Sequence, residues 1–170
     1  MALSFKRYAV LAGAALVLAA TAAPAAAPQP ALTDLQGEPF LLDDYRGRVV
    51  LLNFWATWCA PCLREMPELD RVAGEIDPER AVVLGVAADD PDEVSKFVEK
   101  LRIGYRVASG NPDDVFAWTA ALGNAALGLP FSVLLDAAGD VRWLKSGGTV
   151  TAAEVTALID QQLREQDQDK

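Results

Sequence analysis

The chain of 170 residues carries 52% hydrophobic and 23% charged side chains, which suits one ordinary globular domain and leaves little room for a second. Its formal net charge is −9, and it contains no histidine. An acidic chain without a basic patch binds nucleic acid or anionic lipid headgroups poorly, so we expect neither as a partner.

The N-terminal 25 residues have the pattern of an export signal. Lys6 and Arg7 precede an apolar run over residues 8–20, and an A-x-A arrangement ends at Ala25. We expect cleavage before Ala26, which leaves 13 basic and 24 acidic residues and a net charge of −11. An uncleaved membrane anchor is the alternative, although the run is shorter than the usual span of about 20 residues.

Composition sets the expected limits of the folded domain. Residues 26–30 consist of alanine, proline and one glutamine, and they predict an extended linker because they lack bulky side chains that could pack. The domain itself is expected over residues 31–166. A polar tail at residues 167–170 is expected to fray.

The first elements of the domain follow from apolar patterns. Short apolar pieces at Leu32–Leu35 and Phe40–Leu42 predict an N-terminal β-hairpin. The continuous run VVLLNFW at Val49–Trp55 predicts a central strand that is buried on both faces. Apolar residues then recur at helical spacing, which predicts a helix that starts close to Cys59 and continues through Pro67.

Strands and helices alternate along the rest of the chain. The pattern predicts a strand over 81–88, a helix to about 101, a short strand over 105–108, a helix over 113–122, strands over 131–135 and 141–145, and a last helix from 151 to about 163. This order predicts a mixed sheet between layers of helices.

The two cysteines of the chain lie in the motif Trp58-Cys59-Ala60-Pro61-Cys62, where the buried strand meets the helix. A disulfide between them closes almost no loop and adds little stability. We therefore interpret the two cysteines as a reactive pair and not as a structural crosslink. The unpaired N–H groups at a helix start favour a negative charge, which predicts Cys59 as the attacking thiolate. Cys62, one turn later and facing inward, is then the resolving thiol.

Other uses of two cysteines fit this chain less well. A zinc site needs two more ligands, and the chain has no further cysteine and no histidine. Covalent haem attachment needs a histidine where Leu63 stands. We therefore expect no metal and no cofactor, while two inert buried cysteines remain the alternative.

The run VVLLNFWATWCAPC at residues 49–62 resembles the active-site strand and turn of thioredoxin-fold proteins. It is most similar to exported thiol–disulfide reductases of the TlpA and ResA type, which include the cytochrome c maturation thioredoxins. The resemblance extends over nearly all of the chain after Ala31, with GLPFSVLLDAAGDV at 128–141 as a second match. It implies an α/β thioredoxin-like fold: a mixed central sheet flanked by helices, with an N-terminal β-hairpin and an extra central strand–helix unit.

The resemblance also implies roles for residues around the motif. Pro130 stands where the family has a cis-proline that faces the cysteines, so Leu129 could offer its backbone N–H and C=O to an extended substrate. A trans proline that opens a strand is the alternative. Trp58 is expected to lie partly exposed beside Cys59 and to give apolar contact to partners.

The proton acceptor of the site is harder to identify. Cytosolic thioredoxins have an acidic residue where this chain has Asn53, which cannot take up a proton. By similarity to the ResA-like branch, we expect Asp89 to be partly buried, to have a raised pKa and to help deprotonate Cys62. The alternative is that Asp89 is one of several solvated acids at a helix start.

The uncharged Ala60-Pro61 pair predicts a low reduction potential and therefore a reductase. The resemblance implies oxidised protein substrates, apocytochrome c among them, that form transient mixed disulfides. It also implies a membrane electron donor and a periplasmic location, and we expect a monomer. The alternatives are a thiol peroxidase, which needs a threonine where Ala56 stands, and a copper-binding module, for which the chain offers few soft ligands.

Overall fold

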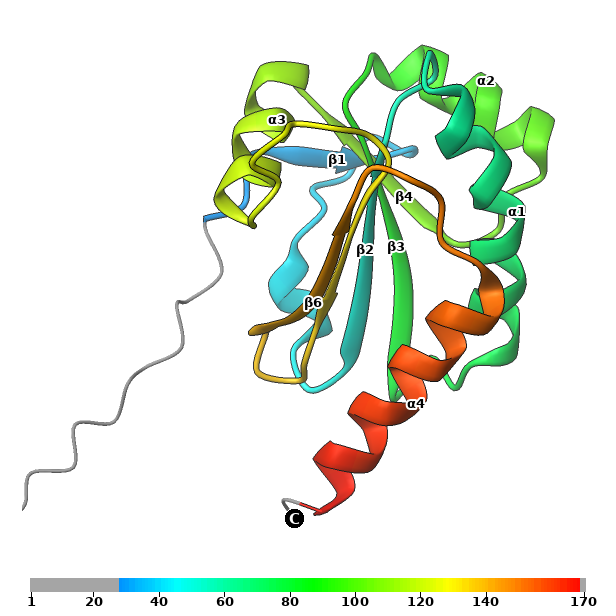
Figure 1. The fold of residues 1–170 in the computed structure, drawn as a ribbon. Helices are drawn as coiled ribbons and strands as arrows, with labels where there is room; N and C mark the ends of the chain where they lie inside the picture. The colour runs from blue at the N-terminus through cyan, green and yellow to red at the C-terminus, as the bar shows by residue number, and fades with distance from the viewer. Residues whose placement is uncertain (1–27, 169–170) are drawn as a thin grey trace, which may run out of the picture.

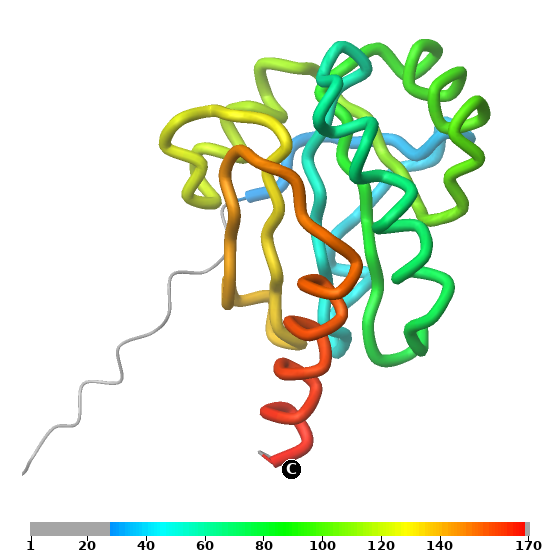
Figure 2. Tube along the Cα trace, turned by 45° about the vertical axis from the view of Figure 1, so that its right-hand side comes forward, coloured from blue at the N-terminus to red at the C-terminus, as the bar shows by residue number. Residues whose placement is uncertain are grey.

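The computed structural model describes residues 28–168, in which helices cover both faces of a six-stranded sheet (Figures 1 and 2). The expected signal and residues 26–27 of the expected linker lie outside the described residues. The elements are β1 (Leu32–Asp34), the 3₁₀ helix η1 (Leu42–Tyr45), β2 (Val49–Trp55), α1 (Ala60–Glu75), β3 (Ala81–Ala87), α2 (Pro91–Leu101), β4 (Arg106–Gly110), α3 (Pro112–Ala121), β5 (Phe131–Leu135), β6 (Val141–Ser146) and α4 (Ala152–Gln168).

The sheet is mixed, as predicted, with the strand order β1-β4-β3-β2-β5-β6. β2 pairs parallel with β3 and antiparallel with β5, and all of its residues are buried. This burial explains its unbroken apolar sequence, because side chains on both faces of the strand enter a core. The inserted α2, β4 and α3 between β3 and β5 confirm the expected extra central unit.

Alternate residues of β2 enter two different cores. Leu51 and Trp55 join a cluster with residues of α1, α2 and α4, whereas Leu52 and Phe54 join a cluster with residues of α3 and η1. Figure 1 shows α1, α2 and α4 together on one side of the sheet and α3 on the other. The sheet is therefore the middle layer of three.

α1 begins directly after β2, as the apolar period predicted. Cys59 is its N-cap residue, and Pro61 lies in the first turn, where a missing N–H costs no helical hydrogen bond. The helix continues through Pro67 to Glu75. The end of a buried strand and the start of a long helix thus meet at the cysteine motif.

The N-terminal hairpin is short. Its second arm contributes only an isolated bridge between Thr33 and Pro39, which is flanked by hydrogen bonds from the N–H of Asp34 to the C=O of Glu38 at 2.8 Å and from the N–H of Phe40 to the C=O of Leu32 at 3.0 Å. β1 pairs antiparallel with β4 and thereby forms the edge of the main sheet instead of lying ahead of it. Leu42, the last residue of the expected second arm, is the first residue of η1.

Contacts extend beyond both expected ends of the domain. Gln29 donates from Nε2 to the C=O of Phe40 at 2.5 Å and accepts from the N–H of Leu42 at 2.6 Å, so residues 28–30 belong to the domain. A polar side chain makes this attachment, which an argument from bulky side chains overlooks. At the other end α4 reaches Gln168, and Asp167 pairs with Arg80 at 2.8 Å. In residues 28–168 no helix is long and apolar enough to cross a membrane.

Candidate active site

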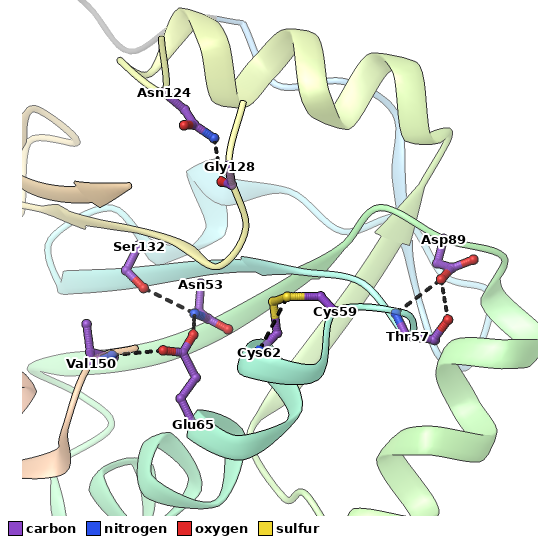
Figure 3. The surroundings of a disulfide bond; sticks show 10 residues. All are labelled: Asn53, Thr57, Cys59, Cys62, Glu65, Asp89, Asn124, Gly128, Ser132 and Val150. Atoms are coloured by element: carbon purple, nitrogen blue, oxygen red, sulfur yellow. Dashed lines mark hydrogen bonds between the residues drawn. A yellow bond between two sulfur atoms is a disulfide. The ribbon is translucent and has the colours of Figure 1, made fainter. Parts of the chain in front are cut away.

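Cys59 and Cys62 form a disulfide at the start of α1 (Figure 3). Cys59 keeps 5% of its surface exposed, whereas Cys62 is completely buried. An incoming thiol or disulfide can therefore reach Cys59 but not Cys62. This difference supports the predicted order, with Cys59 attacking and Cys62 resolving.

The start of α1 favours negative charge on Cys59. Its Sγ accepts a hydrogen bond from the N–H of Cys62 at 3.3 Å. The first turn of α1 contains no acidic side chain that would oppose the partial positive charge of the helix start. Both features stabilise a thiolate relative to a thiol after the disulfide is reduced.

A buried carboxyl group lies behind the disulfide, one turn after Cys62. Glu65 is 2% exposed, and it accepts hydrogen bonds from Asn53 Nδ2 at 2.7 Å and from the N–H of Val150 at 2.9 Å. Burial raises the pKa of Glu65, and these two hydrogen bonds together with the charge of Lys145 offset part of that rise. A carboxyl group with a raised pKa is a better base than an ordinary one, which suits it to proton exchange with a neighbouring thiol.

Asn53 holds this carboxyl group in place. Its Nδ2 also donates to Ser132 Oγ at 3.1 Å, so the amide joins β2, β5 and α1. Within the described residues, its buried Oδ1 has no hydrogen-bond partner. Figure 3 shows Asn53 between Glu65 and the disulfide. Asn53 cannot take up a proton itself, but it positions a group that can.

Sequence reasoning missed Glu65, although the sequence contains a signal for it. Cys62, Met66 and Leu69 recur at helical spacing and face the sheet. Glu65 falls on the same buried face, three residues after Cys62, where an acidic side chain is rarely placed without a specific partner. An acid inside an apolar helical stripe next to a redox motif is therefore a candidate functional group.

Asp89 has other partners than the expected one. It is half-buried, as predicted, and its Oδ2 accepts from the N–H of Thr57 at 3.1 Å and from the Thr57 hydroxyl at 2.5 Å. In Figure 3 it points to Thr57, on the far side of Cys59 from Glu65. Proton transfer by Asp89 stays a prediction, and Glu65 is a second carboxyl group that is a candidate for that role.

An Asp89→Asn variant separates the two carboxyl groups. Because Asp89 contacts the loop before Cys59, we expect the pH dependence of the Cys62 reaction to stay unchanged. The second-order rate of Cys59 alkylation should change by less than about threefold, the effect of weakening one hydrogen bond by about 0.6 kcal/mol. Stopped-flow alkylation of the reduced protein across pH 5 to 9 measures the reactivity of Cys59. The rate at which Cys62 displaces a small thiol from a mixed disulfide preformed on Cys59, followed over the same pH range, measures the Cys62 reaction. A shifted Cys62 profile would instead assign the proton transfer to Asp89.

The peptide bond between Leu129 and Pro130 is cis, as the resemblance implied. The Leu129 side chain packs against both cores. In the described part of the chain its backbone N–H and C=O have no hydrogen-bond partner, whereas the C=O of Pro130 accepts from Gly147 at 3.0 Å. Leu129 therefore presents free backbone groups, which an extended peptide can pair with.

Trp58 is the most exposed large apolar side chain among the described residues, at 66%. It directly precedes Cys59, so its surface is available to a molecule that approaches the disulfide. Trp55 is fully buried, and Trp118 packs edge-to-face on Phe54 at 5.1 Å, so both contribute to the packing of the core. Residues 28–168 contain no group of three His, Cys, Asp or Glu side chains that could hold a metal ion.

The chain is similar to proteins of known family and structure. Its residues 24–144 match the AhpC/TSA family. The thiol-disulfide oxidoreductase ResA of Geobacillus kaustophilus is 35% identical over 138 residues, which make up 80% of this chain and 75% of that protein. ResA of Geobacillus thermodenitrificans is 34% identical with the same coverage.

Solved structures share the architecture. A thiol:disulfide interchange protein of the thioredoxin family from Chlorobium tepidum superposes with a TM-score of 0.68 at 26% identity, covering 85% of this chain and 99% of that one. A secreted thiol-disulfide isomerase from Corynebacterium glutamicum superposes with a TM-score of 0.69 at 27% identity, covering 81% of this chain and 84% of that one.

Proposed function

Because this chain belongs to the AhpC/TSA family of thioredoxin-like proteins and is a thiol–disulfide oxidoreductase, we propose that it reduces disulfides of other exported proteins through Cys59 and Cys62. One observation carries the proposal. A barely accessible sulfur at the N-terminus of α1 is bonded to a fully buried sulfur one turn later, with a buried carboxyl group behind it.

The geometry supports a reaction in two exchanges. The Cys59 thiolate attacks one sulfur of the client disulfide, the client S–S bond breaks, and the departing client thiolate takes a proton from solvent. Cys62 then gives its proton to the Glu65 carboxylate and attacks Cys59 Sγ. The mixed disulfide breaks, the second client sulfur leaves as a thiolate that is protonated in turn, and the Cys59–Cys62 bridge forms. The client gains two electrons, which the protein loses.

Client recognition is proposed to use the free backbone of Leu129 and the exposed ring of Trp58. An extended client segment would add to Leu129 as a short strand, with hydrogen bonds that do not depend on client sequence. Trp58 would cover the apolar side chains next to the client cysteine. Cys59 lies within reach of the client sulfur in this arrangement, whereas Cys62 stays covered.

The reduction potential tests the direction of the reaction. Ala60 and Pro61 add no charge that would stabilise the thiolate further. We therefore expect a potential nearer to the roughly −270 mV of thioredoxin than to the roughly −120 mV of a dedicated oxidant. Equilibration with glutathione buffers, read by Trp58 fluorescence and thiol alkylation, measures it. A potential near the higher value would contradict a reductase, and a protein that forms no dithiol would contradict the exchange chemistry itself.

We propose export to the periplasm, supported by the N-terminal signal pattern and by the secreted relative from Corynebacterium glutamicum. A periplasmic reductase needs a donor that carries electrons across the membrane, and the donor would reduce the bridge through Cys59. Apocytochrome c with an oxidised haem-attachment pair is the proposed client, and the protein is proposed to act as a monomer. The mass of the exported protein, measured by mass spectrometry, distinguishes a cleaved signal from one that is retained as an anchor.

Two other functions are tested directly. A thiol peroxidase needs a threonine where Ala56 stands, and the hydroxyl of the adjacent Thr57 donates to Asp89 instead of facing Cys59. Peroxide consumption by the reduced protein at a rate comparable with disulfide reduction would favour that function. For a copper-binding module, metal analysis after purification under reducing conditions would show stoichiometric copper.

A further inference from the structure

Asn124 is completely buried although it lies in a loop whose neighbours are exposed. Its Nδ2 donates to the C=O of Gly128 at 3.0 Å and to Thr119 Oγ1 at 3.4 Å, while its Oδ1 accepts from Ser146 Oγ at 2.5 Å. One amide therefore joins the end of α3, the end of β6 and the loop before Pro130. Every polar group of this side chain is used.

The backbone conformation of the loop between Asn124 and Gly128 is not one that its residues prefer locally. Leu127 has a φ of +50°, in the left-handed region that leucine rarely adopts, and its side chain is 50% exposed. Its N–H donates to the backbone C=O of Asn124 at 3.1 Å. Such a conformation persists only where surrounding contacts hold it, and here Leu127 is bonded to the backbone of Asn124 while the next residue, Gly128, is bonded to the Asn124 side chain.

The bond from Asn124 decides which peptide groups of the loop face inward. The C=O of Gly128 points to the buried amide, as Figure 3 shows. The next residue, Leu129, packs its partly buried side chain against both cores and has unpaired backbone groups. If Gly128 were released, the Leu129 peptide could rotate, and its N–H and C=O would no longer keep the spacing that an extended partner needs.

We propose that Asn124 is a positioning residue for client binding, which fixes Gly128 so that the backbone of Leu129 is held ready to pair with an extended client chain. This inference rests on the proposed function. It assigns no part in the exchange chemistry to Asn124, because the disulfide is held by α1 and β2 and not by this loop.

An Asn124→Ala variant compared on two substrates tests the inference. One substrate is a linear peptide of about ten residues with a disulfide between two cysteines, and the other is the small aromatic disulfide 5,5′-dithiobis(2-nitrobenzoic acid), which cannot add as a strand. We expect KM for the peptide to rise about tenfold, equivalent to about 1.4 kcal/mol. The kcat for the peptide, the rate with the small disulfide and the reduction potential should all stay within about twofold.

Two further variants keep the result interpretable. Ser146→Ala removes one partner of Asn124 from an exposed position, and we expect a rise of about threefold in peptide KM alone. This variant carries the test if Asn124→Ala does not fold. Asn111→Ala is the matched control, because Asn111 caps the other end of α3 through Asp113 and Asp114 and its loss lowers stability without touching the loop.

Equal losses with both substrates, or an unchanged peptide KM in Asn124→Ala and Ser146→Ala, would overturn the positioning role. A peptide effect of the same size in Asn111→Ala would also overturn it, because stability alone would then explain the result. If the unchanged protein reduces neither substrate, the proposed function fails instead, so the two failures are distinguishable.

Discussion

A Cys62→Ser variant is expected to stop after the first exchange and to remain joined to its client through Cys59. Serine cannot attack the mixed disulfide, while Cys59 keeps its place at the helix start and its Sγ keeps the N–H of residue 62 as donor. Turnover of a peptide disulfide should fall by about 10³-fold or more, the scale of loss when one member of a catalytic unit is removed. Intact-mass spectrometry of the unreduced adduct measures the trapped client directly.

A Cys59→Ser variant is the matched control, and it should show neither turnover nor adduct. Cys62 is completely buried, so a client disulfide cannot reach it. An adduct on Cys62 in that variant would reverse the two roles. Absence of an adduct in Cys62→Ser, with the alkylation of Cys59 intact, would contradict the two-exchange reaction.

A Glu65→Gln variant is expected to slow the second exchange by about 10²-fold, the lower end of what a positioned acid or base contributes. Glutamine keeps the shape of the side chain and can still accept from Asn53 or Val150, but it cannot take the proton of Cys62. The rate of client attack at Cys59 should stay within about twofold. Rapid quenching with acid, followed by quantification of the mixed disulfide, separates the two steps.

The same substitution is expected to change how stability depends on pH. The pKa of Glu65 is raised in the folded protein above its ordinary value of 4.5, chiefly by burial. Below that ordinary value the group is protonated in both states and has no effect. As the pH rises, the unfolded state loses its proton first, so stability falls until the folded pKa is passed.

Glutamine does not titrate, so the free energy of unfolding of Glu65→Gln minus that of the unchanged protein should rise across this pH range. The rise amounts to about 1.4 kcal/mol for each unit by which the pKa is raised. Urea denaturation of the oxidised proteins between pH 4 and pH 9 measures it. Glu75→Gln, on the exposed side of the same helix, is the matched control. A flat difference for Glu65→Gln would show that Glu65 titrates normally.

The elements that sequence alone predicted well are those with strong local patterns. The apolar run of β2 and the helical period after Cys59 each determine both local structure and burial. The strand, the helix and the position of the cysteine pair between them could therefore be predicted. The pairing of β1 with β4 could not be predicted from local patterns, because it joins Leu32 to Gly110, which are far apart in the sequence. The hairpin interpretation considered only the neighbouring segment.

The buried network behind the disulfide was beyond sequence reasoning for the same reason. Glu65 receives its hydrogen bonds from Asn53, on a strand before the helix, and from Val150, 85 residues later. The contacts of Gln29 could not be predicted from composition either, because one polar side chain makes them through hydrogen bonds to the backbone of Phe40 and Leu42. At the start of α4 the Thr151 hydroxyl accepts from the N–H of Glu154 at 3.2 Å, whereas the Glu154 carboxylate pairs with the distant Lys145 at 3.1 Å.

The alternation of side chains along β2 makes the length of this strand as important as its composition. Asn53 reaches Glu65 because it shares a face with Leu51 and Trp55, whereas Phe54 points to the opposite core. One residue inserted near Val50 would send asparagine into the aromatic core and phenylalanine towards the carboxyl group. Such a protein would still contain both cysteines at their original spacing, yet it would lack the polar surroundings that let the second sulfur give up its proton.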